Sequence, residues 1–176
     1  MLSAETSVGA YPVDAVATMA RIIVAAEREW PSAPPARTAQ AGGPPETGAP
    51  ESTGSAIARA AGEVGAAVGA KALVAFTMTG ETARRLARCR SPIPLLAFTT
   101  ESATRSQLAL TWGAETVLVP SVAHTDDMVR QVEVALRDIG RCAQGDVVVI
   151  VAGSPPGTPG RTNALRVHRI GDAIES

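Results

Sequence analysis

The sequence predicts an α/β domain in which helices cover both faces of a mostly parallel sheet. The first observation is that short, continuously apolar segments alternate with helical segments, as in strands that are buried on both faces. The second is that the last strand follows the fourth without an intervening helix, so those two must pair antiparallel. The third is composition: 45% of the 176 residues are hydrophobic and 19% are charged, which is enough to build a core.

The N-terminal segment is expected to hold one amphipathic helix, over residues 12–29. Apolar residues recur there at helical spacing, and Pro12 suits the first helical position because proline lacks the N–H group that stays unpaired there. Residues 1–11, which precede it, are expected to form the end of a strand and a loop.

A linker is expected over residues 30–54. This segment holds six of the 13 prolines, four glycines and almost no large apolar residue. Such a composition cannot bury enough surface to offset the entropy lost on ordering. The chain therefore divides into residues 1–29, the linker over 30–54 and a globular part over 55–176.

Within the globular part, helices and strands alternate. Helices are expected over residues 55–69, 80–90, 101–112 and 125–140, and strands over 71–77, 94–99, 115–119, 146–152 and near 164–170. Arg166 and Arg169 interrupt the apolar pattern of the last strand, as expected of an antiparallel strand at a sheet edge.

Composition also excludes several classes of function. A net charge of −1 argues against a general nucleic-acid-binding protein, and no apolar run is long enough to span a membrane. The N-terminus lacks the features of a signal peptide, and Cys89 and Cys142 fit neither a zinc site nor a disulfide framework. Both thiols are expected to be free and buried in a cytoplasmic protein. No sequence pattern predicts a catalytic centre or a metal site.

One candidate binding site follows the first strand of the globular part. Thr77, Thr79 and Thr82 supply hydroxyls, Gly80 lets a ligand approach the backbone, and the next helix offers free N–H groups. These groups favour a phosphate. The alternative is helix capping by Thr79, and Glu81 in the first turn disfavours an anion.

A second candidate site follows the fourth strand, over residues 153–163. Three glycines and three prolines among eleven residues indicate a shaped loop, in which Arg161 and hydroxyl groups are donors. The alternative is a plain connection to the last strand. If the first and fourth strands are neighbours, both candidate sites lie at one crevice.

Other polar residues are weaker candidates. Four arginines near the second helix of the globular part are expected to form a solvated face, with Glu81 paired to Arg85; they are Arg84, Arg85, Arg88 and Arg90. His124 is expected in a helix-capping region, and His168 at an interface or on the surface.

Several stretches together resemble the pyruvate kinase family. Residues 1–12 (MLSAETSVGAYP) resemble the segment that joins the eighth strand of the catalytic barrel to its last helix. The globular part resembles the C-terminal domain. The matching stretches are ALVAFT (72–77), Thr79-Gly80, Ala83-Arg84, Leu86-Ala87-Arg88, PLLAF (94–98), GDVVVIVAG (145–153) and Thr162-Asn163. The Arg-rich, Lys-poor composition resembles that of actinobacteria.

This resemblance implies a five-stranded sheet of order 3-2-1-4-5 that holds an allosteric site and contributes to a homotetramer. The phosphate of the effector would contact Thr77, Thr79, Gly80 and Thr82, and the effector loop would include Gly157, Thr158, Gly160 and Arg161. Family members that respond to fructose 1,6-bisphosphate often carry Lys at the position of Met78 and Arg near that of Met128. AMP or a sugar monophosphate is therefore the expected effector.

The resemblance implies that catalysis resides elsewhere in the family enzyme. Mg²⁺, K⁺ and ADP/ATP would bind the full-length enzyme, and of this chain only Ser3 and Glu5 match positions near that cleft. One helix cannot close a barrel, so the helix over 12–29 must repack or self-associate to cover its apolar stripe. The remaining alternatives are a free-standing phosphate-binding module and a purely structural oligomerisation domain.

Overall fold

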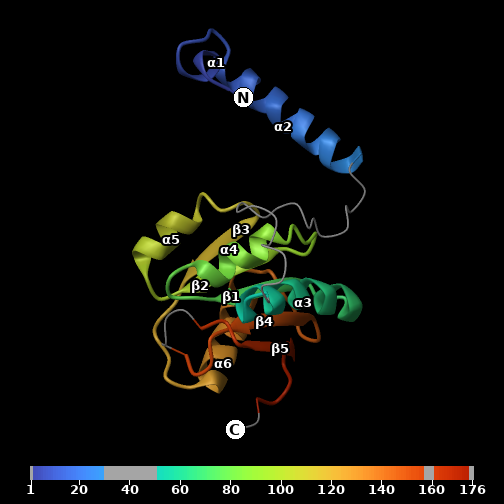
Figure 1. Ribbon diagram of the computed structural model, residues 1–176, viewed down its shortest axis with the longest axis vertical. Helices are drawn as coiled ribbons and strands as arrows, with labels where there is room; N and C mark the ends of the chain where they lie inside the picture. The colour runs from blue at the N-terminus through green and yellow to red at the C-terminus, as the bar shows by residue number, and fades with distance from the viewer. Residues whose placement is uncertain (1, 30–50, 157–160, 175–176) are drawn as a thin grey trace. The chain divides into compact units, whose positions relative to one another are not determined.

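A computed structural model describes residues 2–29, 51–156 and 161–174 of the chain (Figure 1). The chain divides into two compact units, residues 1–37 and residues 38–176.

The described part of the first unit is helical. Helix α1 spans Ala4–Ser7 and helix α2 spans Pro12–Glu29, the bounds expected for α2. The prediction of a strand end and a loop over residues 1–11 is wrong where α1 forms. The carbonyl of Ser3 accepts hydrogen bonds from the amide and the hydroxyl of Thr6, and these local bonds close a helical turn.

The second unit is built on a five-stranded sheet of order β3-β2-β1-β4-β5. The strands are β1 (Ala72–Phe76), β2 (Leu95–Thr99), β3 (Ala114–Leu118), β4 (Val147–Ala152) and β5 (Ala164–Arg169). All neighbours pair in parallel except β4 and β5, which are antiparallel. The expected order and the antiparallel edge strand are both confirmed.

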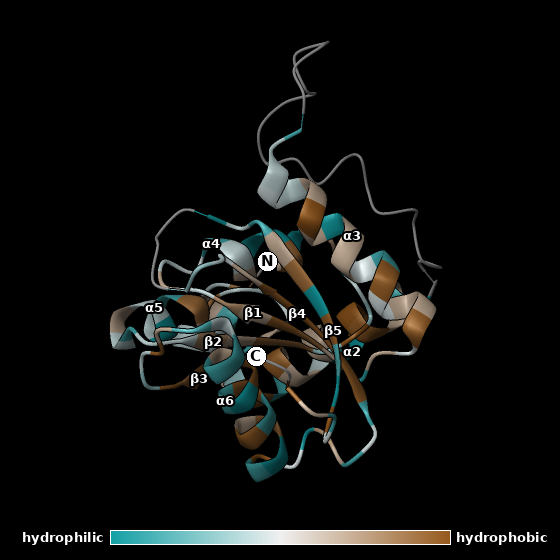
Figure 2. Cartoon of the chain, turned by 90° about the horizontal axis from the view of Figure 1, so that it is seen from below, coloured by the Kyte–Doolittle hydropathy of each residue, from teal (hydrophilic) through white to brown (hydrophobic). Residues whose placement is uncertain are grey.

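Helices cover both faces of this sheet, which confirms the three-layer architecture (Figure 1). On one face lie α3 (Thr53–Val68), α4 (Glu81–Arg88) and α5 (Ser102–Leu108), and α6 (Thr125–Asp138) lies on the other. All residues of β1 and β2 are buried, and the central strands are largely hydrophobic in Figure 2. The continuous apolar runs therefore reflect strands that are covered on both faces.

All four helices of the second unit differ by a few residues from the predicted bounds, and local hydrogen bonds explain two of these differences. Helix α3 begins at Thr53 rather than at residue 55, since the Ser52 side chain accepts a bond from the Ser55 amide and caps the helix. Helix α5 ends at Leu108 rather than at residue 112, where the Thr111 amide bonds to the Leu108 carbonyl in a turn. The predicted linker over 30–54 lies mostly outside the described residues, and its last residues begin α3.

The prediction for His168 is wrong, because this side chain is only 3% exposed. His168 lies on β5 opposite Val148, so it points to the face of the sheet that α6 covers. There its Nε2 atom lies 2.8 Å from a carboxylate oxygen of Glu133 on α6. The polar partner lets an imidazole occupy a buried position.

Candidate functional site

The carboxyl ends of β1 and β4 lie side by side, because these strands are parallel neighbours at the centre of the sheet. The β1–α4 turn (residues 77–80) and the β4–β5 loop (residues 153–163) both start at this edge. The two segments picked out from the sequence are therefore brought together. In an open α/β sheet, this edge is where ligands bind.

Helix α4 begins at Gly80, not at Thr79. Gly80 is the N-cap residue, with a φ of 82°, a region that glycine adopts without strain. Its amide donates a hydrogen bond to the buried Thr77 hydroxyl at 3.0 Å, so Thr77 shapes the turn. The alternative that Thr79 caps the helix is wrong, since Gly80 takes the cap position and no side chain forms a cap bond. Thr79 is exposed at the turn.

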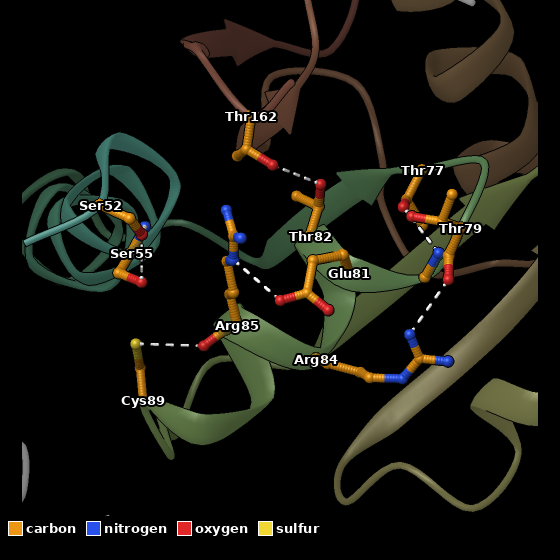
Figure 3. A network of polar contacts seen from close by, with 11 residues as sticks. Ser52, Ser55, Thr77, Thr79, Glu81, Thr82, Arg84, Arg85, Cys89 and Thr162 are labelled. Atoms are coloured by element: carbon orange, nitrogen blue, oxygen red, sulfur yellow. Dashed lines mark hydrogen bonds and ion pairs between the residues drawn. The ribbon is translucent and has the colours of Figure 1, made fainter. Parts of the chain in front are cut away.

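Two side chains outside the predicted site hold the carbonyl groups of the turn. The hydroxyl of Thr104 on α5 donates to the Met78 carbonyl at 2.7 Å. The Arg84 guanidinium donates to the Thr79 carbonyl at 3.0 Å (Figure 3). It also donates to the side-chain oxygen of Gln107 at 3.3 Å. With its carbonyls held in this way, the turn is fixed from two helices. No sequence pattern pointed to Thr104, because its partner is 26 residues away.

A hydrogen bond between two threonines joins the first turn of α4 to the β4–β5 loop. The hydroxyl oxygens of Thr82 and Thr162 lie 2.8 Å apart, and the two residues are 4% and 6% exposed (Figure 3). Gly54 at the start of α3 packs against the same place, because a Cβ atom there would come within 3.2 Å of the Thr162 Cβ atom. Thr82 and Thr162 thus link segments that are 80 residues apart.

The base of the β4–β5 loop is closed by Asn163. Its side-chain oxygen accepts from the Ser154 amide at 2.7 Å, and its side-chain nitrogen donates to the Ser154 carbonyl at 3.0 Å. Gly153 permits this closure, because a Cβ atom there would lie 2.2 Å from the Arg161 carbonyl oxygen. Arg161 is exposed, whereas the predicted loop residues Gly157, Thr158 and Gly160 lie outside the described residues.

The charged groups around α4 are distributed differently from the prediction. The expected pair forms, with Arg85 Nε 3.0 Å from a Glu81 carboxylate oxygen, so the negative charge in the first turn is balanced. Arg90 lies beyond the end of α4, and its guanidinium lies 4.2 Å from the ring centre of Trp112. The four arginines therefore do not form one solvated helical face.

Ser3 and Glu5, the positions that match near the family's catalytic cleft, interact with each other in the first unit. A Glu5 carboxylate oxygen accepts from the Ser3 amide at 2.9 Å. Hydrogen bonds from the backbone amides of Glu5 and Ser3 lower the pKa of this carboxyl group below its ordinary value. This local bonding stabilises the start of α1.

Among the residues that the structure describes, no three His, Cys, Asp or Glu side chains gather where they could hold a metal ion. Over the same ranges, no helix has the length and hydropathy needed to cross a bilayer. His124 occupies the N-cap position of α6, as expected of a capping region, but its side chain forms no cap bond.

Comparison with known proteins shows which proteins this chain is similar to. A family model described as the pyruvate kinase alpha/beta domain matches residues 55–168. Pyruvate kinases of Mycobacterium tuberculosis and Corynebacterium glutamicum are 52% and 46% identical, each over 98% of this chain and 34% of the relative. The pyruvate kinase of Staphylococcus aureus is 33% identical over 99% of this chain and 29% of its own length. The chain thus spans about a third of the length of these relatives.

Proposed function

Because this chain belongs to the pyruvate kinase alpha/beta-domain family, we propose that it is the regulatory part of a pyruvate kinase. In this role it binds a phosphorylated small molecule at the β1–α4 turn and contributes to subunit association. The whole enzyme would transfer phosphate from phosphoenolpyruvate to ADP in glycolysis, with Mg²⁺, K⁺ and ADP/ATP held by other parts. Location in the cytoplasm belongs to the same proposal, supported by the free cysteines Cys89 and Cys142.

The observation that carries the proposal is the Thr82–Thr162 hydrogen bond at the carboxyl ends of β1 and β4. It joins the start of α4 to the β4–β5 loop, so a ligand there would contact both. The first-turn amides of α4 carry the positive end of the helix dipole, and the exposed Thr79 hydroxyl adds a donor. Such donors suit a phosphate group.

The surroundings favour a ligand with one phosphate. The residue next to Thr77 is Met78, which offers no positive charge to a second phosphate. Met128, where an arginine would stand near the site in family members that respond to a bisphosphate, is 4% exposed within the core. AMP or a sugar monophosphate is therefore the preferred effector, and fructose 1,6-bisphosphate is disfavoured.

The test is titration calorimetry of the chain with AMP, a hexose monophosphate, fructose 1,6-bisphosphate and inorganic phosphate. Thr79→Glu puts a carboxylate at the turn, and we expect it to abolish phosphate binding by repulsion. Ser121→Glu is the matched control, because it adds the same charge at an exposed position after β3. Unchanged binding by Thr79→Glu would refute the site.

We also propose that these 176 residues do not perform phosphoryl transfer by themselves. Its support is the share of the relatives' length that the chain spans, about a third. A coupled assay that detects pyruvate formed from phosphoenolpyruvate and ADP by the purified chain would contradict it.

Subunit association is the second part of the proposed role. Strand β5 forms one edge of the sheet, and Val167 on it is exposed. Val134 on α6 is exposed as well. Apolar side chains at a sheet edge and on a covering helix are suited to contact with another copy of the chain. Sedimentation velocity of the purified chain over a range of concentrations tests this, and a strictly monomeric chain would contradict it.

A further inference from the structure

We propose that an exposed surface formed by Arg88, Arg90, Leu110 and Trp112, which we name the tryptophan surface, docks an acidic peptide segment of a partner protein. Carboxylates of that segment pair with the two arginines, and an apolar side chain of the segment packs on Leu110 and Trp112. This surface lies apart from the proposed effector site, so the inference goes beyond the proposed function.

The topology of the sheet brings these four residues together. Arg88 and Arg90 lie at the end of α4, shortly before β2, and Leu110 and Trp112 lie between α5 and β3. Strands β2 and β3 are parallel neighbours, so their amino ends lie side by side. The proposed effector site lies at the opposite edge of the sheet, where the carboxyl ends of the parallel strands meet.

The side chains of the tryptophan surface are open to solvent. Leu110 is 94% exposed and Trp112 is 45% exposed, although both are large and apolar. Arg88 and Arg90 are exposed as well, and neither forms an ion pair with any residue that the structure describes. An open tryptophan ring beside unpaired guanidinium groups is typical of the residues that contribute most to protein–protein binding.

Arg90 occupies a backbone position that favours glycine. Its φ is 50°, and among the described residues it is the one residue other than glycine with a positive φ. The equivalent residue after α6 is Gly140, with a φ of 69°. Helix α4 therefore ends with an arginine where glycine would adopt the same conformation without strain. Such strain is found preferentially at functional sites, and here it places the guanidinium 4.2 Å from the ring centre of Trp112.

Charge complementarity identifies the partner as acidic. The two arginines carry positive charges that no described carboxylate pairs with, so a segment with carboxylates on both sides of an apolar residue matches the surface. Nucleic acid matches it less well, because the chain has a net charge of −1 and Leu110 offers nothing to a phosphate backbone. A second copy of the chain also matches less well, because Glu81 and Glu115 already pair with arginines of their own chain.

Fluorescence titration tests the proposal, because Trp112 is one of the two tryptophans in the chain. The variant Trp30→Phe leaves Trp112 as the reporter. The probes are a hexapeptide with two leucines between pairs of glutamates, the same peptide with glutamine in place of glutamate, and a single-stranded oligouridylate. We expect the acidic peptide alone to shift the emission of Trp112 to shorter wavelength, with an affinity that falls as salt is added.

Three further substitutions in this background separate docking from a structural role. Arg90→Gly removes the guanidinium and the strain together, so we expect the thermal midpoint to be kept while the acidic peptide binds about 2- to 5-fold less tightly, the range of an exposed ion pair. We expect Leu110→Ser to weaken binding as well. Arg130→Gln is the matched control, because this exposed arginine lies on α6, and we expect its affinity to be unchanged.

Each outcome of the titration decides the proposal. Salt-sensitive binding of the acidic peptide that weakens in Arg90→Gly and Leu110→Ser supports docking of an acidic segment. Equal binding of the acidic and neutral peptides, or no emission shift with either, overturns it. A lower thermal midpoint of Arg90→Gly with unchanged peptide affinity overturns it too, since the arginine would then serve the fold alone. A shift caused by the oligouridylate and not by the acidic peptide would assign the surface to nucleic acid and overturn the proposed partner.

Discussion

Among the residues that the structure describes, buried polar side chains are almost all paired. Thr77, Thr82, Thr104, Thr162 and His168 are each less than 9% exposed, and each forms a hydrogen bond. In the part of the chain that the structure describes, one buried side-chain atom lacks a partner, the Oε1 oxygen of Gln131. Pairing is expected because an unpaired buried donor or acceptor retains its full desolvation cost.

The two cysteines predict a stability that depends on pH. Burial, and then the charge of Glu51, raises the pKa of the Cys89 thiol above its ordinary value of 9.0, and burial followed by Asp146 does so for Cys142. The folded chain holds these protons more tightly than the unfolded chain. Their contribution is therefore complete below pH 9.0 and is lost as the pH rises through the raised pKa values.

We expect the free energy of unfolding to fall above pH 9.0, the ordinary thiol value, and to fall less steeply in the variant Cys89→Ala/Cys142→Ala. Urea denaturation at a series of alkaline pH values measures both slopes. Parallel slopes for the wild-type chain and the variant would mean that other groups cause the loss of stability.

At the scale of elements, polar pairs connect α6 to β5. His168 contacts Glu133 at 2.8 Å, and Arg166 lies 3.5 Å from a carboxylate oxygen of Asp126. His168 and Arg166 are two residues apart on β5, so their side chains point to the same face of the sheet. An edge strand with two polar residues on its covered face is thereby docked against a helix.

Glu133 is the residue that tests this docking. Glu133→Ala leaves the buried imidazole of His168 without its partner, and we expect a loss of about 1–3 kcal/mol of folding free energy. Glu133→Gln keeps a side chain that can accept a hydrogen bond, and a smaller loss is expected. Chemical denaturation gives the stability of each variant, and hydrogen exchange at the amides of β5 reports docking. Equal losses for both variants would contradict the role of the hydrogen bond.

At the scale of the whole molecule, the sheet of the second unit and its helices form two hydrophobic clusters. Both hydrophobic clusters consist of residues from Ile57 onward, one between the sheet and α6 and the other between the sheet and α3, α4 and α5. In the first unit, α2 exposes several apolar side chains, namely Val13, Val16, Ile22, Ile23 and Val24. Stability is therefore expected to reside in the second unit.

A chain that begins at residue 38 tests this division. We expect it to fold cooperatively, with the thermal midpoint of the full chain, because no residue of either core cluster has been removed. Circular dichroism during heating measures the midpoint. A large drop in the midpoint would mean that the first unit stabilises the second.

Most of the fold follows from local sequence signals. Continuous apolar runs such as Leu73–Phe76 predict strands that are covered on both faces, and helical spacing predicts α2 with its observed bounds. The absence of a helix between β4 and β5 requires antiparallel pairing. The strand order itself was expected from the resemblance to a family, and periodicity alone does not provide it.

The candidate site was predictable only in part. The sequence by itself determined that Thr77, Thr79, Gly80 and Thr82 follow a buried strand and open a helix. Tertiary structure decided which hydroxyls are already bonded, because Thr162 and Thr104 reach the turn from segments far along the chain. It also decided that His168 is buried, since only the packing of α6 brings Glu133 to it. Local patterns record periodicity and turns, whereas partners for buried polar groups are set by contacts that only the folded chain makes.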